Sequence, residues 1–132
     1  MTNANIVMIE DDELTRCMMR LQMVGAGHIV TGEAATREDA LSLINEVALG
    51  RIACDIITLD GNLGEPDKDC ADALAIATQA RAQHVSAVII GMSSYSLTER
   101  GVPVDLDLTK SHIGQLAATV NELVLPNLSR AA

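Results

Sequence analysis

The sequence predicts an α/β fold: a doubly wound, five-stranded parallel sheet with helices on both faces. Three observations lead to this prediction. Short apolar runs, each bounded by polar or turn-forming residues, recur along the chain. Stretches with helical spacing of apolar residues separate most of these runs, and no internal repeat or low-complexity linker interrupts the order. Short apolar runs are typical of strands buried on both faces, and their alternation with helices is typical of a parallel sheet.

The composition is that of one folded domain. The chain has 132 residues, of which 48% are hydrophobic, so we expect a single domain over residues 1–132 with its core at about residues 5–125. Phe and Trp are absent and Tyr occurs once, so aliphatic side chains, Ala and Met must form the core. The formal charge of −9 argues against direct nucleic-acid binding and suits a metal cation or a basic protein partner.

Cysteine usage and the lack of a long apolar stretch indicate the compartment. The three cysteines show no paired spacing, which favours reduced thiols over a disulfide framework. No apolar stretch approaches the roughly 20 residues that a membrane-spanning helix needs, and the N-terminus lacks the pattern of a signal peptide. We therefore expect a cytoplasmic location without membrane contact.

The first half of the chain is predicted to contain two strands and two helices. Residues 6–9 form an apolar strand, and residues 13–24 follow with helical spacing. A second strand is predicted at residues 28–31. The second helix starts at Thr36, whose hydroxyl can cap it, and Gly50 ends it. The residues predicted to face the core are Leu14, Met18 and Leu21, with Cys17 as a further candidate, and Ala40, Leu43, Ile44 and Val47.

The middle of the chain continues the alternation of strands and helices. The third strand is predicted at residues 56–59, and a loop rich in turn-forming residues follows at residues 61–69. The third helix is Ala-rich and spans about residues 70–83, and the fourth strand is predicted at residues 87–92.

The last part of the chain contains one short connection and one long helix. Residues 93–101 have room for a turn or two of helix at most before Pro103. The fifth strand is predicted at residues 104–108. Ser111 is then expected to cap a last helix that Pro126 ends. Its predicted core residues are Ile113, Leu116, Val120, Leu123 and Val124.

Four of the predicted strands end in polar side chains. Glu10 and Asp11 follow the first strand, Asp60 the third, Ser93 the fourth and Lys110 the fifth. Because ligands of parallel sheets bind beyond the carboxyl ends of the strands, these groups should meet in one crevice. Carboxylates are typical Mg²⁺ ligands, a buried carboxylate can attack phosphorus, and an amine and a hydroxyl can hold phosphoryl oxygens. The pattern predicts a phosphate-and-magnesium pocket.

These motifs, in this order and each at a strand end, resemble the receiver domain of two-component response regulators over roughly residues 5–125. The resemblance implies the flavodoxin-like strand order 2-1-3-4-5. It also implies that Asp60 accepts a phosphoryl group from a histidine kinase or a histidine phosphotransfer protein, and that Ser93 and Lys110 bind the phosphoryl oxygens. The Mg²⁺ ligands that it implies are Glu10, Asp11, Asp60 and the backbone carbonyl of Asn62.

The resemblance also assigns roles to neighbouring residues. Asp12 is an alternative to Asp11 if the register slips by one residue. Ser93 corresponds to the family's switch hydroxyl, and Ser94 to the small residue that follows it. Tyr95 falls where family members carry a residue that tunes hydrolysis of the phosphoryl group; alternatively, it is a loop aromatic that covers the crevice. Such a domain is a phosphoacceptor rather than an enzyme, apart from slow self-dephosphorylation.

Three features depart from the family pattern. Ser111 follows the lysine where the family usually has proline, and Asp107 stands where Tyr or Phe is common. Only residues 94–109 separate Ser93 from Lys110, so the fourth helix is expected to be short or missing. In the family, the surface around that helix commonly passes on the signal. We therefore expect an atypical receiver.

Two other functions stay open at this point. The first is a pseudo-receiver, an interaction module of the same fold whose partner binding does not depend on phosphorylation. The second is a small metal-dependent phosphatase, because Asp60 and its surroundings are similar to an Asp-x-Asp nucleophile motif. Asn62 stands where the second aspartate of that motif should be, which disfavours the phosphatase.

Overall fold

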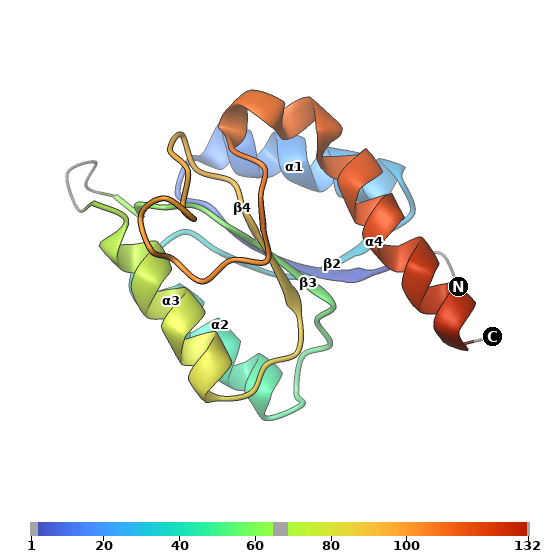
Figure 1. Cartoon of the computed structure of the whole chain (residues 1–132), viewed down its shortest axis with the longest axis horizontal. Coiled ribbons are helices and arrows are strands. Elements are labelled where there is room, and N and C mark those ends of the chain that lie inside the picture. Colours follow the sequence, from blue (N-terminus) through green and yellow to red (C-terminus); the bar gives the residue numbers. More distant parts are fainter. Residues whose placement is uncertain (1–2, 65–68, 132) are drawn as a thin grey trace.

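The structure, a computed structural model, describes residues 3–64 and 69–131, with side chains described up to residue 124 (Figure 1). Its five strands lie in one sheet of order β2-β1-β3-β4-β5, and every neighbouring pair is parallel. The predicted fold class and strand order are therefore confirmed. The strands are β1 (Asn5–Ile9), β2 (Ile29–Ala34), β3 (Ile56–Leu59), β4 (Val88–Gly91) and β5 (Leu106–Asp107). The α-helices are α1 (Glu13–Gly25), α2 (Arg37–Ala48), α3 (Ala71–Ala82) and α4 (Leu116–Ala131).

The helices cover the sheet on both faces. α1 and α4 lie on one face, and α2 and α3 lie on the other (Figure 1). β1 shows the alternation that this requires, since Ile6 and Met8 belong to one buried cluster and Val7 and Ile9 to the other. β1 is apolar on both sides because it is buried between two helical layers.

The buried face of α1 differs from the predicted one. Met19 and Met23 are fully buried, whereas Leu14 is 70%, Met18 46% and Leu21 67% exposed. The prediction that these last three residues face the core is wrong. Both faces of this helix carry large apolar side chains, so their spacing alone does not select the face that contacts the sheet.

Two strands differ from the prediction by more than one residue at an end. β2 begins one residue later and extends further, to Ala34. β5 contains only two residues, because the Asp105 side chain replaces part of the strand ladder. One carboxylate oxygen of Asp105 accepts a hydrogen bond of 2.8 Å from the Ile89 N–H. The Asp105 N–H donates to the Ile89 carbonyl at 2.9 Å.

The connection between β4 and β5 contains no helix. Residues 92–105, all of which the structure describes, form turns and irregular chain. Leu97 and Val102 from this connection are buried in the cluster under α2 and α3, so they replace the apolar face that a helix would supply. The expected short or missing helix concerns this connection, and the structure has none there. The fourth α-helix of the chain, α4, is present and follows β5, where a last helix was predicted.

The last helix begins and ends differently from the prediction. A 3₁₀ segment, Lys110–Gln115, precedes α4, which starts at Leu116. Ser111 therefore does not cap α4, and its hydroxyl lies 2.8 Å from the Thr109 hydroxyl instead. α4 continues past Pro126, so the prediction that this proline ends the helix is wrong. A proline inside a helix can kink it instead of ending it.

Several smaller predictions concern caps and loops. The Thr36 hydroxyl accepts a hydrogen bond of 3.1 Å from the Asp39 N–H, as predicted for the cap of α2. The predicted loop at residues 61–69 includes residues 65–68, which lie outside the described part of the chain. None of the described helices is long and apolar enough to cross a membrane.

Candidate phosphoacceptor site

The candidate site lies at the sheet edge where β1, β3, β4 and β5 end. A pocket of about 230 Å³ opens there, between the loops that follow these strands. Most of the side chains predicted for one crevice line it. The lining residues are Asp11, Asp60, Asn62, Gly64, Ser93, Ser94, Tyr95 and Lys110.

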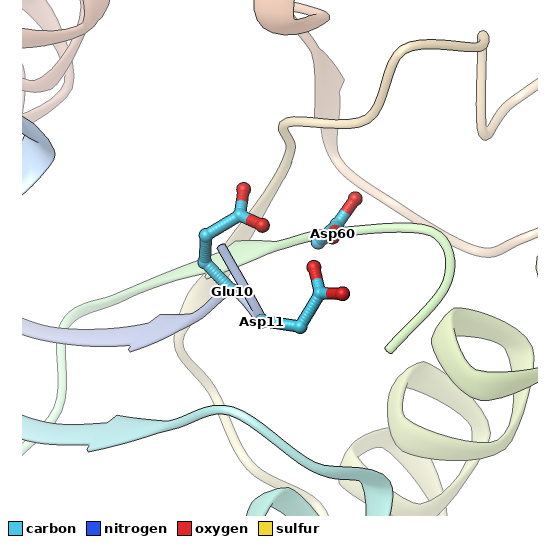
Figure 2. A group of neighbouring side chains, drawn as sticks. All are labelled: Glu10, Asp11 and Asp60. Carbon is cyan, nitrogen blue, oxygen red and sulfur yellow. The ribbon is translucent and has the colours of Figure 1, made fainter. Parts of the chain in front are cut away.

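Three carboxylates form a compact acidic cluster in this region. One oxygen each of Glu10, Asp11 and Asp60 lies within 4.8 Å of the others, and Figure 2 shows the three side chains close together. Glu10 is 1% and Asp60 5% exposed, so two of the charges are buried. Asp12 lies outside the cluster, because its carboxylate caps α1 by accepting a hydrogen bond of 2.9 Å from the Thr15 N–H.

Lys110 is the cation of the acidic cluster. Its Nζ lies 3.1 Å from Glu10 Oε1 and 3.5 Å from Asp60 Oδ1. The Lys110 N–H donates to the Ser93 carbonyl at 2.8 Å, which ties the end of β5 to the loop after β4. The preceding residue, Thr109, has φ 62° and ψ 158°, a conformation that a β-branched residue rarely adopts. The backbone is thus held in a strained geometry where it presents the lysine.

Burial favours the protonated form of two of the three carboxyl groups in the site, Asp60 and Glu10. Burial raises the pKa of Asp60 to about 8, and the neighbouring charge of Glu10 adds to this effect, while Lys110 opposes it. Burial likewise raises the pKa of Glu10. Partial burial of Asp11 is outweighed by hydrogen bonds from its neighbours, which lower the pKa of Asp11. For Lys110, burial is outweighed by the charges of Asp60 and Glu10, which raise its pKa. One cation therefore faces more negative charge than it can neutralise.

Ser93 and Gly61 are packed against each other beside the acidic cluster. Ser93 is 2% exposed, and an added Cβ on Gly61 would lie 2.6 Å from its Oγ. Only glycine fits there without moving the hydroxyl. Sequence reasoning missed this role of Gly61, although its position directly after a strand-terminal aspartate was a usable signal.

Two further contacts shape the loop after β3. The Gly64 N–H donates to Asp11 Oδ2 at 3.0 Å, so this backbone amide helps to hold an acid of the cluster. The Asn62 side chain accepts a hydrogen bond of 2.8 Å from the Cys70 N–H and thereby connects the loop to the start of α3. Neither contact has a signature in the sequence pattern.

Comparison with known proteins shows which fold the chain has. No protein-family model and no curated protein sequence matches the chain. Solved structures do match over most of its length. A LuxR-family DNA-binding response regulator from Staphylococcus aureus has a TM-score of 0.71 at 20% identity, over 90% of this chain and 97% of that one. The chain has the receiver-domain fold.

Two other receiver domains show the same likeness. The non-phosphorylated receiver domain of the stress response regulator RcsB from Escherichia coli has a TM-score of 0.71 at 16% identity, covering 92% of each chain. The receiver domain of the histidine kinase CKI1 from Arabidopsis thaliana, solved in complex with Mg²⁺, has a TM-score of 0.64 at 20% identity, covering 91% of each chain. Receiver domains are typically signalling phosphoacceptors rather than enzymes.

The acidic cluster of this receiver fold has the chemistry of a cation site. Its three carboxylates supply hard oxygen ligands of the kind that Mg²⁺ prefers. Glu10 Oε1 is buried and has no hydrogen-bond partner among the described residues, although Lys110 Nζ is 3.1 Å away. A divalent cation would offset the excess negative charge, so the residues present fit this group.

Asp107, on β5, contacts residues of the connection between β4 and β5. One of its oxygens accepts hydrogen bonds from the Ser96 hydroxyl at 2.7 Å and from the Thr98 N–H at 3.0 Å. Its other oxygen would lie 2.8 Å from a Cβ on Gly91. The Asp107 carboxylate therefore holds the connection between β4 and β5 in place.

Proposed function

We propose that this chain is a receiver domain of a two-component system in which Asp60 accepts a phosphoryl group. The donor would be the phosphohistidine of a histidine kinase or of a histidine phosphotransfer protein. The observation that carries the proposal is the buried Asp60 carboxylate, which lies beside two other acids and within 3.5 Å of Lys110 in a pocket that Ser93 lines. Its receiver fold supports the same conclusion.

The transfer requires a nucleophile and groups that hold the phosphoryl oxygens. A carboxylate oxygen of Asp60 forms the new bond to phosphorus, while the bond from phosphorus to the donor's imidazole nitrogen breaks and its electron pair stays on that nitrogen. Lys110 and the Ser93 hydroxyl are positioned to hold phosphoryl oxygens, which carry most of the negative charge. Movement of these two residues toward the phosphoryl group would bias the surface that a downstream protein recognises.

Mg²⁺ is the cofactor that we propose. When bound, it would offset the negative charge of the carboxylates and of the phosphoryl oxygens. Asp60 must lose its proton to act as a ligand or as a nucleophile, and a nearby cation favours that ionisation. The proposed ligands are Glu10, Asp11, Asp60 and the backbone carbonyl of Asn62.

The extent of the unit and its location are part of the same proposal. We treat residues 1–132 as one receiver-like domain with a core at about residues 5–125. We place it in the cytoplasm, where phosphohistidine donors and reduced thiols are found. Direct contact with nucleic acid is not part of the proposed role, because the chain carries a formal charge of −9.

Treatment with acetyl phosphate and Mg²⁺ tests the proposal. The expected result is a mass gain of one phosphoryl group in the unaltered chain and none in Asp60→Asn. Asp55→Asn is a matched control, because this exposed aspartate precedes the opposite end of the same strand. The proposal is wrong if the unaltered chain gains no mass or if Asp60→Asn gains as much.

The pseudo-receiver is the second candidate, and Asp107 is the observation that favours it. Its contacts with Ser96 and Thr98 hold the β4–β5 connection, where other receivers have the helix that commonly passes on the signal. An interaction module predicts no mass gain with acetyl phosphate and unchanged partner binding in Asp60→Asn. A phosphatase predicts turnover of p-nitrophenyl phosphate, so a flat assay would exclude it.

A further inference from the structure

Tyr95 lies at the pocket, and the guanidinium of Arg100 lies over its ring. Tyr95 is one of the residues that line the pocket, as is Ser93, and 52% of Tyr95 is exposed. The guanidinium carbon of Arg100 lies 4.9 Å from the centroid of the ring, within the range of a cation–π interaction. The Tyr95 N–H donates to Ser93 Oγ at 3.4 Å, so the backbone under the ring is tied to the site.

Arg100 is held from two directions. Its backbone N–H donates to the Leu97 carbonyl at 3.1 Å, and Leu97 is fully buried, so the turn that carries the arginine has a rigid base. Its guanidinium forms an ion pair with Asp69, which precedes α3 on the loop after β3. One side chain thus contacts an aromatic ring from one loop of the pocket and a carboxylate from another.

We propose that Arg100 is a positioning residue that holds the Tyr95 ring at the mouth of the pocket and so prolongs the lifetime of a phosphoryl group on Asp60. This inference rests on the proposed phosphoacceptor function. Loss of the phosphoryl group requires a water molecule, whose oxygen forms a bond to phosphorus as the bond from phosphorus to the Asp60 oxygen breaks. The products are the Asp60 carboxylate and dihydrogen phosphate, and a ring at the pocket mouth restricts the approach of that water.

The expected size of the effect follows from the two contacts. An exposed cation–π contact and an exposed ion pair together favour the held position of the ring over its other positions by about fivefold in population, which corresponds to about 1 kcal/mol. Arg100→Ala should therefore shorten the phosphoryl lifetime about fivefold. Arg100→Lys keeps a cation over the ring and should restore part of the lifetime. In Tyr95→Ala, removal of Arg100 should have no additional effect, because the arginine acts through the ring.

The first experiment needs neither phosphate nor metal. Tyr95 is the only tyrosine and the chain has no Trp, so intrinsic fluorescence reports on this ring alone. Arg100→Ala should raise the acrylamide quenching constant by up to about twofold, because about half of the residue is already exposed. Arg51→Ala is the matched control: Arg51 also forms an exposed ion pair, with Glu46, but lies before β3 at the other end of the sheet. Equal quenching in the unaltered chain and in Arg100→Ala would overturn the proposed contact.

The second experiment measures the lifetime of the phosphoryl group after acetyl phosphate and Mg²⁺ are removed. An Arg100→Ala chain that loses the group about fivefold faster, with Arg51→Ala unchanged, supports the inference. If the unaltered chain takes up a phosphoryl group and Arg100→Ala loses it at the same rate, the inference is wrong and the phosphoacceptor function stands. If the unaltered chain takes up none, the proposed function is wrong and the lifetime claim falls with it. The quenching result is independent of both.

Discussion

The buried carboxyl pair at the end of the sheet should make the metal-free protein less stable as the pH rises. Asp60 has a pKa of about 8 in the folded chain, against 3.8 for an unperturbed aspartate. Between these values the folded state keeps a proton that the unfolded state has lost. Stability therefore falls as the pH rises, by about 1.4 kcal/mol per pH unit, and levels off above about pH 8.

The perturbation that isolates this effect is Asp60→Asn. Between about pH 6 and about pH 9, the unaltered chain should lose about 3 kcal/mol more unfolding free energy than the variant, since two pH units lie below the pKa of Asp60. Comparison of the two chains removes the titration of shared groups that do not interact with Asp60.

Urea unfolding followed by circular dichroism, with chelator present, measures this difference. The expected result is that the stabilities of the two chains diverge as the pH rises from about 6 to about 8 and then run parallel. Parallel pH profiles over the whole range would show that Asp60 is already ionised at neutral pH. In that case the electrostatic account of the site would be wrong.

Three further predictions concern the core, the packing beside Asp60 and the cation of the site. Met19→Ala should lower the unfolding free energy by about 2–5 kcal/mol in urea denaturation, whereas Met18→Ala, on the exposed face of α1, should change it by less than about 1 kcal/mol. Gly61→Ala should displace the Ser93 hydroxyl, which would lie 2.6 Å from the new Cβ, and slow uptake of the phosphoryl group from acetyl phosphate; uptake at the normal rate would contradict the packing. Lys110→Gln removes the only cation within 4 Å of Asp60 among the described residues, so it should raise the pKa of that carboxyl further, seen by NMR titration as a higher midpoint.

The fold and the position of the candidate site were predictable because both follow from short-range patterns. An apolar strand that ends in a polar residue specifies where its side chain emerges. The parallel order of the strands then brings Glu10, Asp60 and Lys110 to one edge of the sheet. These three residues are far apart in the sequence, yet no long-range information beyond the alternation of strands and helices was needed to place them together.

The buried face of α1 was not predictable in the same way. Leu14, Met18 and Leu21 repeat with helical spacing, as do Met19 and Met23, so the pattern contains two apolar stripes. The choice between them depends on how α1 packs against the rest of the fold, which is a tertiary property. In the structure Met19 and Met23 are the pair that packs in the core.

The connections around β5 depended on side-chain contacts that a pattern does not encode. Asp105 and Asp107 use their carboxylates to hold backbone N–H groups of neighbouring segments, which shortens the strand and fixes the turn before it. The contact between Tyr95 and Arg100 is of the same kind. Such contacts join residues whose spacing in the sequence has no regular period, so only the folded chain reveals them.

The central claim is that Asp60 is the residue that carries the phosphoryl group. Borohydride reduction converts an aspartyl phosphate into homoserine, which peptide mass spectrometry can assign to a single position. After treatment with acetyl phosphate and Mg²⁺, the account predicts homoserine at position 60 and at no other aspartate. Homoserine at position 11 or 12, or its absence from a chain that has gained phosphoryl mass, would contradict it.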